Sequence, residues 1–113
     1  MRLLRVGLLP QEPLAAAATF HAEILPRVTE ALADRQDLIL VFGPADHTHR
    51  EWRLAIVRGL ARQHAPVRVN AVAGDDEAAI AAVAEYLTRA PGVTGQLLPL
   101  DGIGAVPVLY PVG

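Results

Sequence analysis

The residues most able to support chemistry form the short polar cluster DHTHR, residues 46–50. The imidazoles of His47 and His49 exchange protons near neutral pH, so either could serve as a general base. Arg50 could hold an anion beside them. The cluster therefore predicts a small catalytic or ligand-binding site, with polar groups from Asp46, His47, His49 and Arg50.

The same cluster has two other interpretations. Asp46, His47 and His49 are possible metal ligands, but the alternate spacing of the histidines suits a strand better than a helix, and no further strong ligand is close in sequence. We therefore predict no metal site. Asp46 or Thr48 could instead cap the helix that follows, with Glu51 three residues after Thr48. This structural role is the one that the pattern favours.

Two other polar features are predicted to be structural. The acids of GDDE, residues 74–77, could bind a cation or a donor-rich ligand, but acidic residues at this position usually stabilise a helix N-terminus. Asn70 lies in an apolar segment, and its side chain is expected to satisfy nearby backbone groups.

Composition excludes several mechanisms. The chain has no Cys, no Ser and no Lys, so thiol and serine nucleophiles, cysteine metal sites and Schiff-base lysines are ruled out. With 113 residues, 52% of them hydrophobic and 19% charged, the sequence predicts one globular domain over residues 1–113.

Charge and hydropathy limit the kinds of partner and the cellular compartment that the sequence predicts. The net charge of -2 does not indicate a nucleic-acid partner. No apolar run approaches the roughly 18 residues that a membrane span needs, so no membrane association is predicted. The N-terminus lacks the long apolar core and the cleavage site of a signal peptide. We therefore predict a cytoplasmic protein.

Apolar runs and helical segments alternate along the chain. Strands are predicted at 3–9, 37–42, 67–73 and 95–102, and helices at 12–35, 47–65 and 75–90. Such alternation predicts an α/β domain of about four parallel strands with helices on both faces, in three layers. Pro26 must kink or split the first helix because it lacks a backbone donor. The second helix is predicted to carry a polar face of four arginines, Arg50, Arg53, Arg58 and Arg62.

The residues after the first strand do not form a nucleotide-binding turn. No G-x-G-x-x-G motif is present, and no glycine lies between Gly7 and Gly43. We therefore predict no cofactor and no cofactor-binding residues.

Two motifs near the C-terminus resemble the last part of a short-chain dehydrogenase/reductase. Residues 68–74 read RVNAVAG, and residues 93–102 read VTGQLLPLDG, in the order and at about the distance found in that family. Weaker similarity extends back through LARQHAP (60–66) and FHAEILPRV (20–28). The resemblance implies a truncated Rossmann-like domain, because the family's nucleotide-binding half would lie before residue 1.

The sequence departs from this family at its catalytic residues. The family's catalytic Tyr position falls on Asp46, and its Lys position, four residues later, falls on Arg50. The two tyrosines, Tyr86 and Tyr110, lie elsewhere, and the proline that the family places after Ala73 is missing. The resemblance therefore implies a protein that is not, by itself, a nicotinamide-dependent reductase.

The apolar residues of the second helix exceed what one sheet can cover. In the resembled family the equivalent helix pairs with its mate in a dimer, so we predict an interface that includes Phe20, Ile24, Trp52, Ile56 and Leu60. The first strand is expected to expose an apolar, unpaired edge. The apolar tail, 103–113, is predicted to be extended and to pack across a neighbour.

The leading hypothesis is a catalytically inactive, short-chain dehydrogenase-like subunit. It would form a dimer or tetramer, or dock on a full-length dehydrogenase. The alternatives are a small enzyme or ligand-binding protein that uses the Asp46, His47, His49 and Arg50 cluster, and a homodimeric scaffold without a small ligand.

Overall fold

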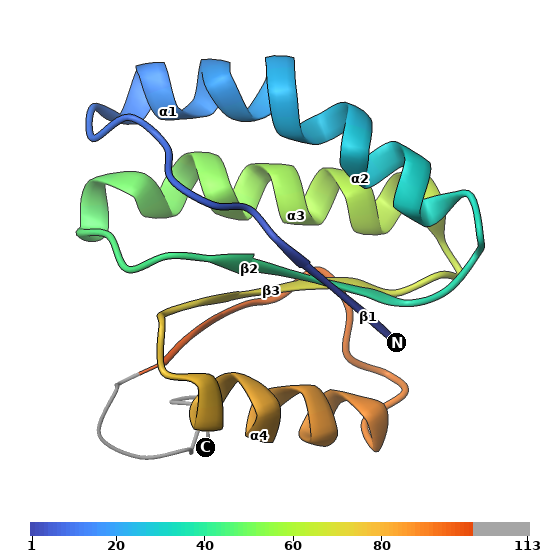
Figure 1. Ribbon diagram of the computed structural model, residues 1–113. Coiled ribbons are helices and arrows are strands. Elements are labelled where there is room, and N and C mark those ends of the chain that lie inside the picture. The colour runs from blue at the N-terminus through green and yellow to red at the C-terminus, as the bar shows by residue number, and fades with distance from the viewer. Residues whose placement is uncertain (101–113) are drawn as a thin grey trace.

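A computed structural model of the protein describes residues 1–100. Four strands form one parallel sheet in the order β1-β2-β3-β4 (Figure 1). Their bounds are Arg2–Arg5 for β1, Leu38–Phe42 for β2, Val69–Ala73 for β3 and Leu97–Pro99 for β4. This arrangement confirms the predicted Rossmann-like α/β sheet of four parallel strands.

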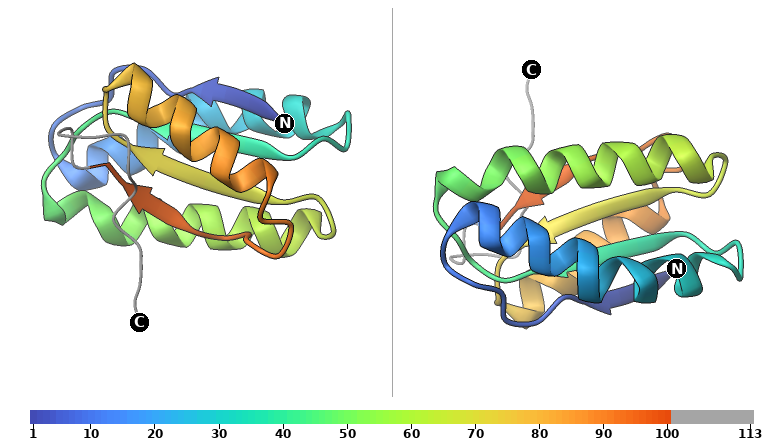
Figure 2. Two further views of the ribbon diagram at one scale, coloured as in Figure 1. Left: turned by 90° about the horizontal axis from the view of Figure 1, so that it is seen from below. Right: turned by 90° about the horizontal axis from the view of Figure 1, so that it is seen from above.

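Helices cover both faces of the sheet, as predicted. On one face lies a continuous helical segment made of α1 (Pro13–Thr19), η1 (Phe20–Ile24) and α2 (Leu25–Leu32), side by side with α3 (Arg50–His64) (Figure 2). A short 3₁₀ turn, η2 (His47–His49), leads into α3. Among residues 1–100, helix α4 (Glu77–Thr88) is the one helix that covers the opposite face (Figure 1). None of these helices has the length and apolar character needed to cross a membrane.

Strand β2 explains how the sheet separates two apolar cores. All five of its residues are buried. Because side chains alternate along a strand, Leu38, Leu40 and Phe42 pack under α1–α3, whereas Ile39 and Val41 pack against α4. The uninterrupted apolar run in the sequence therefore reflects cover on both faces.

The first helical segment passes Pro26 without breaking. It widens instead into a π-helical turn over Phe20–Ile24, which ends two residues before the proline, and the segment bends visibly between α1 and α2 (Figure 1). Pro26 has no N–H to donate to the carbonyl four residues earlier, and a π turn is a common way to accommodate such a defect. The turn keeps both Phe20 and Ile24 buried against the sheet.

Arg68 joins three parts of the chain. Its Nε donates to Asp37 Oδ2 at 2.9 Å, next to the start of β2. One terminal nitrogen donates to the carbonyls of Leu87 at 3.0 Å and Ala90 at 2.7 Å, at the end of α4. The guanidinium therefore clamps the end of α4 to the start of β2 and β3.

Asn70 fixes the loop before β4 in the same region. It is 1% exposed; its amide nitrogen donates to the Val93 carbonyl, and its oxygen accepts from the Gln96 backbone N–H, each at 3.0 Å. The expectation that Asn70 satisfies backbone groups is confirmed. The resembled RVN motif thus has a structural function in this chain.

The outer edge of β1 differs from the expected apolar edge. Leu3 is exposed there, but the arginines on either side of the central leucines form ion pairs, Arg2 with Asp34 and Arg5 with Glu77. Charged side chains on an edge strand discourage pairing with other strands. Residues 101 and 102 of the predicted fourth strand and the predicted interacting tail, 103–113, lie outside the described residues.

Candidate functional site

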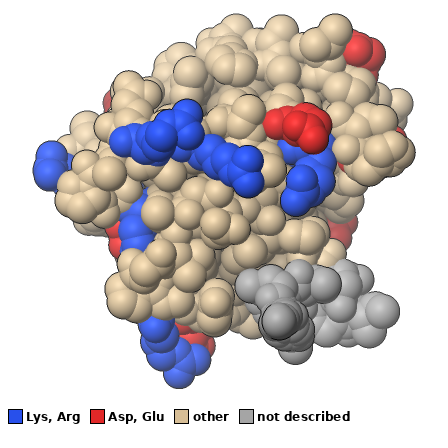
Figure 3. All heavy atoms as spheres, turned by 180° about the vertical axis from the view of Figure 1, so that it is seen from behind, with Lys and Arg blue, Asp and Glu red and all other residues tan. Residues whose placement is uncertain are grey.

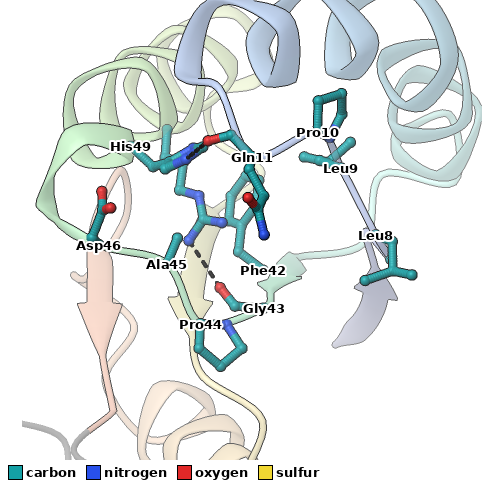
Figure 4. Close-up of a pocket in the computed structure, with 12 residues that line it drawn as sticks. Leu8, Leu9, Pro10, Gln11, Phe42, Gly43, Pro44, Ala45, Asp46 and His49 are labelled. Atoms are coloured by element: carbon teal, nitrogen blue, oxygen red, sulfur yellow. Dashed lines mark hydrogen bonds between the residues drawn. The ribbon is translucent and has the colours of Figure 1, made fainter.

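A cavity of about 500 Å³ lies at the carboxyl ends of β1 and β2. Its walls are residues 7–11 after β1, residues 42–46 around the end of β2, and two side chains of the α3 region, His49 and Arg53 (Figure 4). A smaller cavity of about 190 Å³ adjoins it and shares Ala45, Asp46, His49 and Arg53. Ligands of doubly wound α/β proteins bind at this edge of the sheet, so we take this cavity as the candidate site.

His49 is held at the cavity wall by both of its ring nitrogens. Trp52 Nε1, which can only donate, lies 3.0 Å from His49 Nδ1. The Gln11 carbonyl, which can only accept, lies 2.9 Å from Nε2 (Figure 4). These partners match Nδ1 as an acceptor and Nε2 as a donor. Since neither nitrogen is free, His49 positions the loop after β1 and is not placed to take a proton from a substrate.

Arg53 is the buried cation of the site. It is 7% exposed, and one terminal nitrogen donates to the Gly43 carbonyl at 3.0 Å; this bond is the dashed line that ends at Gly43 in Figure 4. Its guanidinium lies 4.6 Å from the centre of the Phe42 ring. Nε is buried and has no hydrogen-bond partner among the described residues. Burial lowers the pKa of this guanidinium because the charged form loses its hydration.

The expectation that Arg53 belongs to a polar, solvent-facing side of α3 is therefore wrong. Arg50, Arg58 and Arg62 are exposed, whereas Arg53 faces the sheet. Its spacing from His49 places the two residues on one face of the helix, but the sequence does not show which face docks on the sheet.

The predicted cluster is only partly brought together. Asp46 and His49 line both cavities, whereas His47 and Arg50 are exposed and contribute only to the smaller one. Within residues 1–100, no three side chains of the metal-ligating types gather closely enough to hold an ion.

Asp46 caps the helix, which was one of the two predicted possibilities. Its carboxylate accepts from the Thr48 backbone N–H at 2.9 Å and from the Thr48 hydroxyl. These bonds, the hydroxyl bond first, hold the pKa of the Asp46 carboxyl below its usual value of 3.8. The remaining predicted residue of the motif, Glu51, lies in the first turn of α3.

Replacing Asp46 with asparagine should reduce the acid sensitivity of folding. A carboxyl with a depressed pKa stabilises the fold above its unfolded pKa, and this stabilisation is lost as the pH falls below 3.8 through the folded pKa. Asp46→Asn keeps an acceptor but does not titrate. The free energies of unfolding of the wild type and the variant, measured by urea denaturation on both sides of pH 3.8, should therefore converge toward acid pH. Parallel curves would contradict this role, and Thr48→Val should give an intermediate result.

Three helices begin at this edge of the sheet, and each is capped by its own carboxylate. Glu12 accepts from two backbone N–H groups of α1, Asp46 caps the turn before α3, and Asp76 accepts from Ala78 and Ala79 of α4. The predicted structural role of the GDDE acids is thus confirmed for Asp76.

These caps bear on whether this edge could hold the nicotinamide dinucleotide that the resembled family uses. A pyrophosphate is normally held by free N–H groups at a helix N-terminus after a glycine-rich turn. Here Glu12 occupies those groups on α1, and Gly7 is the one glycine of the preceding turn. The residues described at this edge therefore do not fit a dinucleotide phosphate.

The predicted interface residues fall into two groups. Phe20, Ile24 and Leu60 are buried in the chain's own core, so they offer little surface to a partner. Trp52 and Ile56 are half-buried and line an open depression of about 360 Å³ between α2 and α3. This depression, hereafter the α2–α3 groove, is lined by His21, Leu25, Trp52, Ala55, Ile56, Gly59, Leu60 and Gln63.

Comparison with known proteins identifies the family. The model of a family described as short chain dehydrogenase-like protein matches residues 4–100. No curated protein and no solved structure matches the chain. The family match covers nearly all of the residues that form the sheet and its helices, and it agrees with the motifs RVNAVAG and VTGQLLPLDG. The chain therefore belongs to the short-chain dehydrogenase-like protein family.

Proposed function

We propose that this protein is a non-catalytic member of its family that works as an oligomeric subunit and associates with a second copy through the α2–α3 groove. The observation that carries the proposal is the apolar lining of this groove. Leu25, Trp52 and Ile56 remain partly exposed there, although most apolar side chains of the same helical layer are buried. A partner that covered them would remove apolar surface from water.

The site residues support a function without proton transfer. Asp46 and Arg50 occupy the positions at which the resembled family has its Tyr and Lys, and Asp46 is engaged as a helix cap. His49 uses both ring nitrogens in structural hydrogen bonds. No residue of the cluster therefore combines a free proton-transfer group with a position in the larger cavity.

The groove suits a second helix of the same kind. Ala55 and Gly59 lie one helical turn apart on its floor, and the space above Gly59 is open. Small residues at a helix contact allow the two axes to approach closely. The resembled family pairs its equivalent helices across a dimer, so a second copy is the occupant to which we commit. Binding of a full-length dehydrogenase in the groove, in place of a second copy, would contradict this choice of occupant.

A single substitution on the surface of the groove would test self-association. Exposed arginines of α3 (Arg50, Arg58 and Arg62) lie on the same helix, and a row of basic side chains crosses the face of the molecule seen in Figure 3. Replacing Ala55 with glutamate should block association, because a carboxylate would have to be buried between the copies. Ala55 is exposed in the single chain, so folding should be preserved.

Sedimentation velocity over a range of concentrations would measure this effect. The wild type should form a dimer or a higher oligomer, Ala55→Glu should be a monomer, and Ala81→Glu on the exposed side of α4 should behave as the wild type. Circular dichroism would verify that each variant is folded. A monomeric wild type, or equal association of all three proteins, would overturn self-association through the groove. A stable complex with only a dehydrogenase-sized chain in the native cell would replace it.

The cavity supports a second candidate function, the binding of a small ligand. The specific observation is that a buried guanidinium lines the larger cavity and has no carboxylate partner among residues 1–100. In such a function the polar groups would be Asp46, His49 and Arg53, with Arg53 taking the anion-holding role that the sequence suggested for Arg50. Binding at this site and association through the groove are separate properties and can be tested separately.

A further inference from the structure

We propose that the larger cavity binds a small organic acid, with its carboxylate at Arg53 and its apolar part along the walls. This inference deepens the second candidate function, ligand binding at the cavity, and does not depend on self-association. It rests on the charge balance of Arg53, on the carboxylate caps around the cavity and on the chemistry of the lining.

The charge of Arg53 has no counter-ion in the described part of the chain. The arginine ion pairs among residues 1–100 are Arg2–Asp34, Arg5–Glu77, Arg68–Asp37 and Arg89–Glu85. Arg53 is more buried than these pairs, yet it has only the Gly43 carbonyl and the face of Phe42. Buried charges are normally paired, so a ligand carboxylate would supply the missing partner.

The surroundings favour a carboxylate over a phosphate. Glu12, Asp46 and Asp76 already occupy the helix N-termini at this edge, so no capped helix offers spare N–H groups to a phosphate. Asp46 also lines the cavity and would repel a doubly charged group. A single buried guanidinium balances a single negative charge, and it can be reached only at its terminal nitrogens because Nε is covered.

The rest of the cavity suits an apolar body. Leu9, Phe42, Pro44 and Ala45 contribute apolar lining, and its volume of about 500 Å³ is in the range of small-molecule sites. Leu8 is fully exposed at the end of the lining farthest from His49 (Figure 4). An apolar chain that leads from Arg53 toward Leu8 would cover this side chain and gain hydrophobic contact.

The single tryptophan provides a local probe of binding. The Trp52 indole N–H bonds to His49, and the ring centre is 5.8 Å from the Arg53 guanidinium. We would titrate ¹⁵N-labelled protein with octanoate, 1-octanol and inorganic phosphate and follow the Trp52 indole and Arg53 Nε resonances. Octanoate should shift both resonances with saturation, whereas 1-octanol and phosphate should bind at least about tenfold more weakly.

Two variants make the test specific. Arg53→Met should weaken octanoate binding by about tenfold or more, because the charged hydrogen bond is lost. Arg58→Met, which removes an exposed arginine five residues further along α3, should bind as the wild type. If Arg53→Met did not fold, the shift of the wild-type Arg53 Nε resonance would still report the contact.

The possible results distinguish failure of this inference from failure of the ligand-binding candidate on which it rests. Octanoate binding that is unchanged in Arg53→Met would overturn the inference. Saturable binding of phosphate or 1-octanol, but not octanoate, would leave a ligand site but refute a carboxylate ligand. If none of the three probes shifts Trp52 or Arg53, both the inference and the ligand-binding candidate fail.

Discussion

Replacing Arg68 with methionine is expected to lower the free energy of unfolding by about 3 kcal/mol. The substitution removes a charged bond to Asp37 and two bonds to carbonyls at the end of α4. Asp37 would then remain partly buried without its partner, and the carbonyls of Leu87 and Ala90 would lose their donor. Urea denaturation monitored by circular dichroism would measure the change.

A surface arginine provides the matched comparison. Arg58→Met makes the same chemical change at an exposed position of α3, so it should alter the free energy of unfolding by less than about 0.5 kcal/mol. If Arg68→Met were as mild as Arg58→Met, the clamp between α4 and the sheet would contribute little to stability. Hydrogen exchange should then also show no local loosening of the end of α4.

The same substitution at Arg53, Arg53→Met, should change stability in the opposite direction and raise the free energy of unfolding by about 1 kcal/mol. Arg53 gains one bond to the Gly43 carbonyl and a contact with Phe42, but its charge is desolvated without a carboxylate and Nε is unsatisfied. Methionine would fill similar space without a buried charge. Thermal and urea unfolding of the ligand-free proteins would measure the gain.

This second effect also separates stability from binding. A variant that is more stable, yet no longer binds octanoate, would indicate that the arginine is maintained at a cost to the fold for the sake of a ligand. Loss of stability in Arg53→Met would instead assign Arg53 a structural role through Gly43 and Phe42. Arg58→Met is again the comparison, with little change in either property.

Much of the fold could be predicted from the sequence. The apolar run of β2 indicated a strand buried on both faces, and the alternation of segments predicted a parallel sheet. Asp46 was one of two possible caps, and the structure selects it because its carboxylate reaches the Thr48 N–H. These features depend on neighbouring residues or on simple periodicity, which a sequence displays directly.

The side that α3 turns toward the sheet could not be predicted in the same way. The sequence grouped Arg53 with the exposed arginines, but the side that a helix turns to the sheet depends on how its first turn docks. Here a 3₁₀ turn over His47–His49 precedes α3, and contacts with Gln11 and Trp52 orient it. The π turn over Phe20–Ile24 could not be predicted either, because Pro26 indicates that the helix is interrupted but not which irregular conformation the backbone adopts.

Trp52 lies between the α2–α3 groove and the larger cavity. Its ring lines the α2–α3 groove, and its indole nitrogen is bonded to His49 at the wall of the cavity. One side chain thus forms part of both sites. A change in the position of Trp52 at one site would therefore change the geometry of the other. If a cavity ligand repositions Trp52 and changes the dimerisation constant by some factor, thermodynamic reciprocity requires dimerisation to change the ligand's affinity by the same factor.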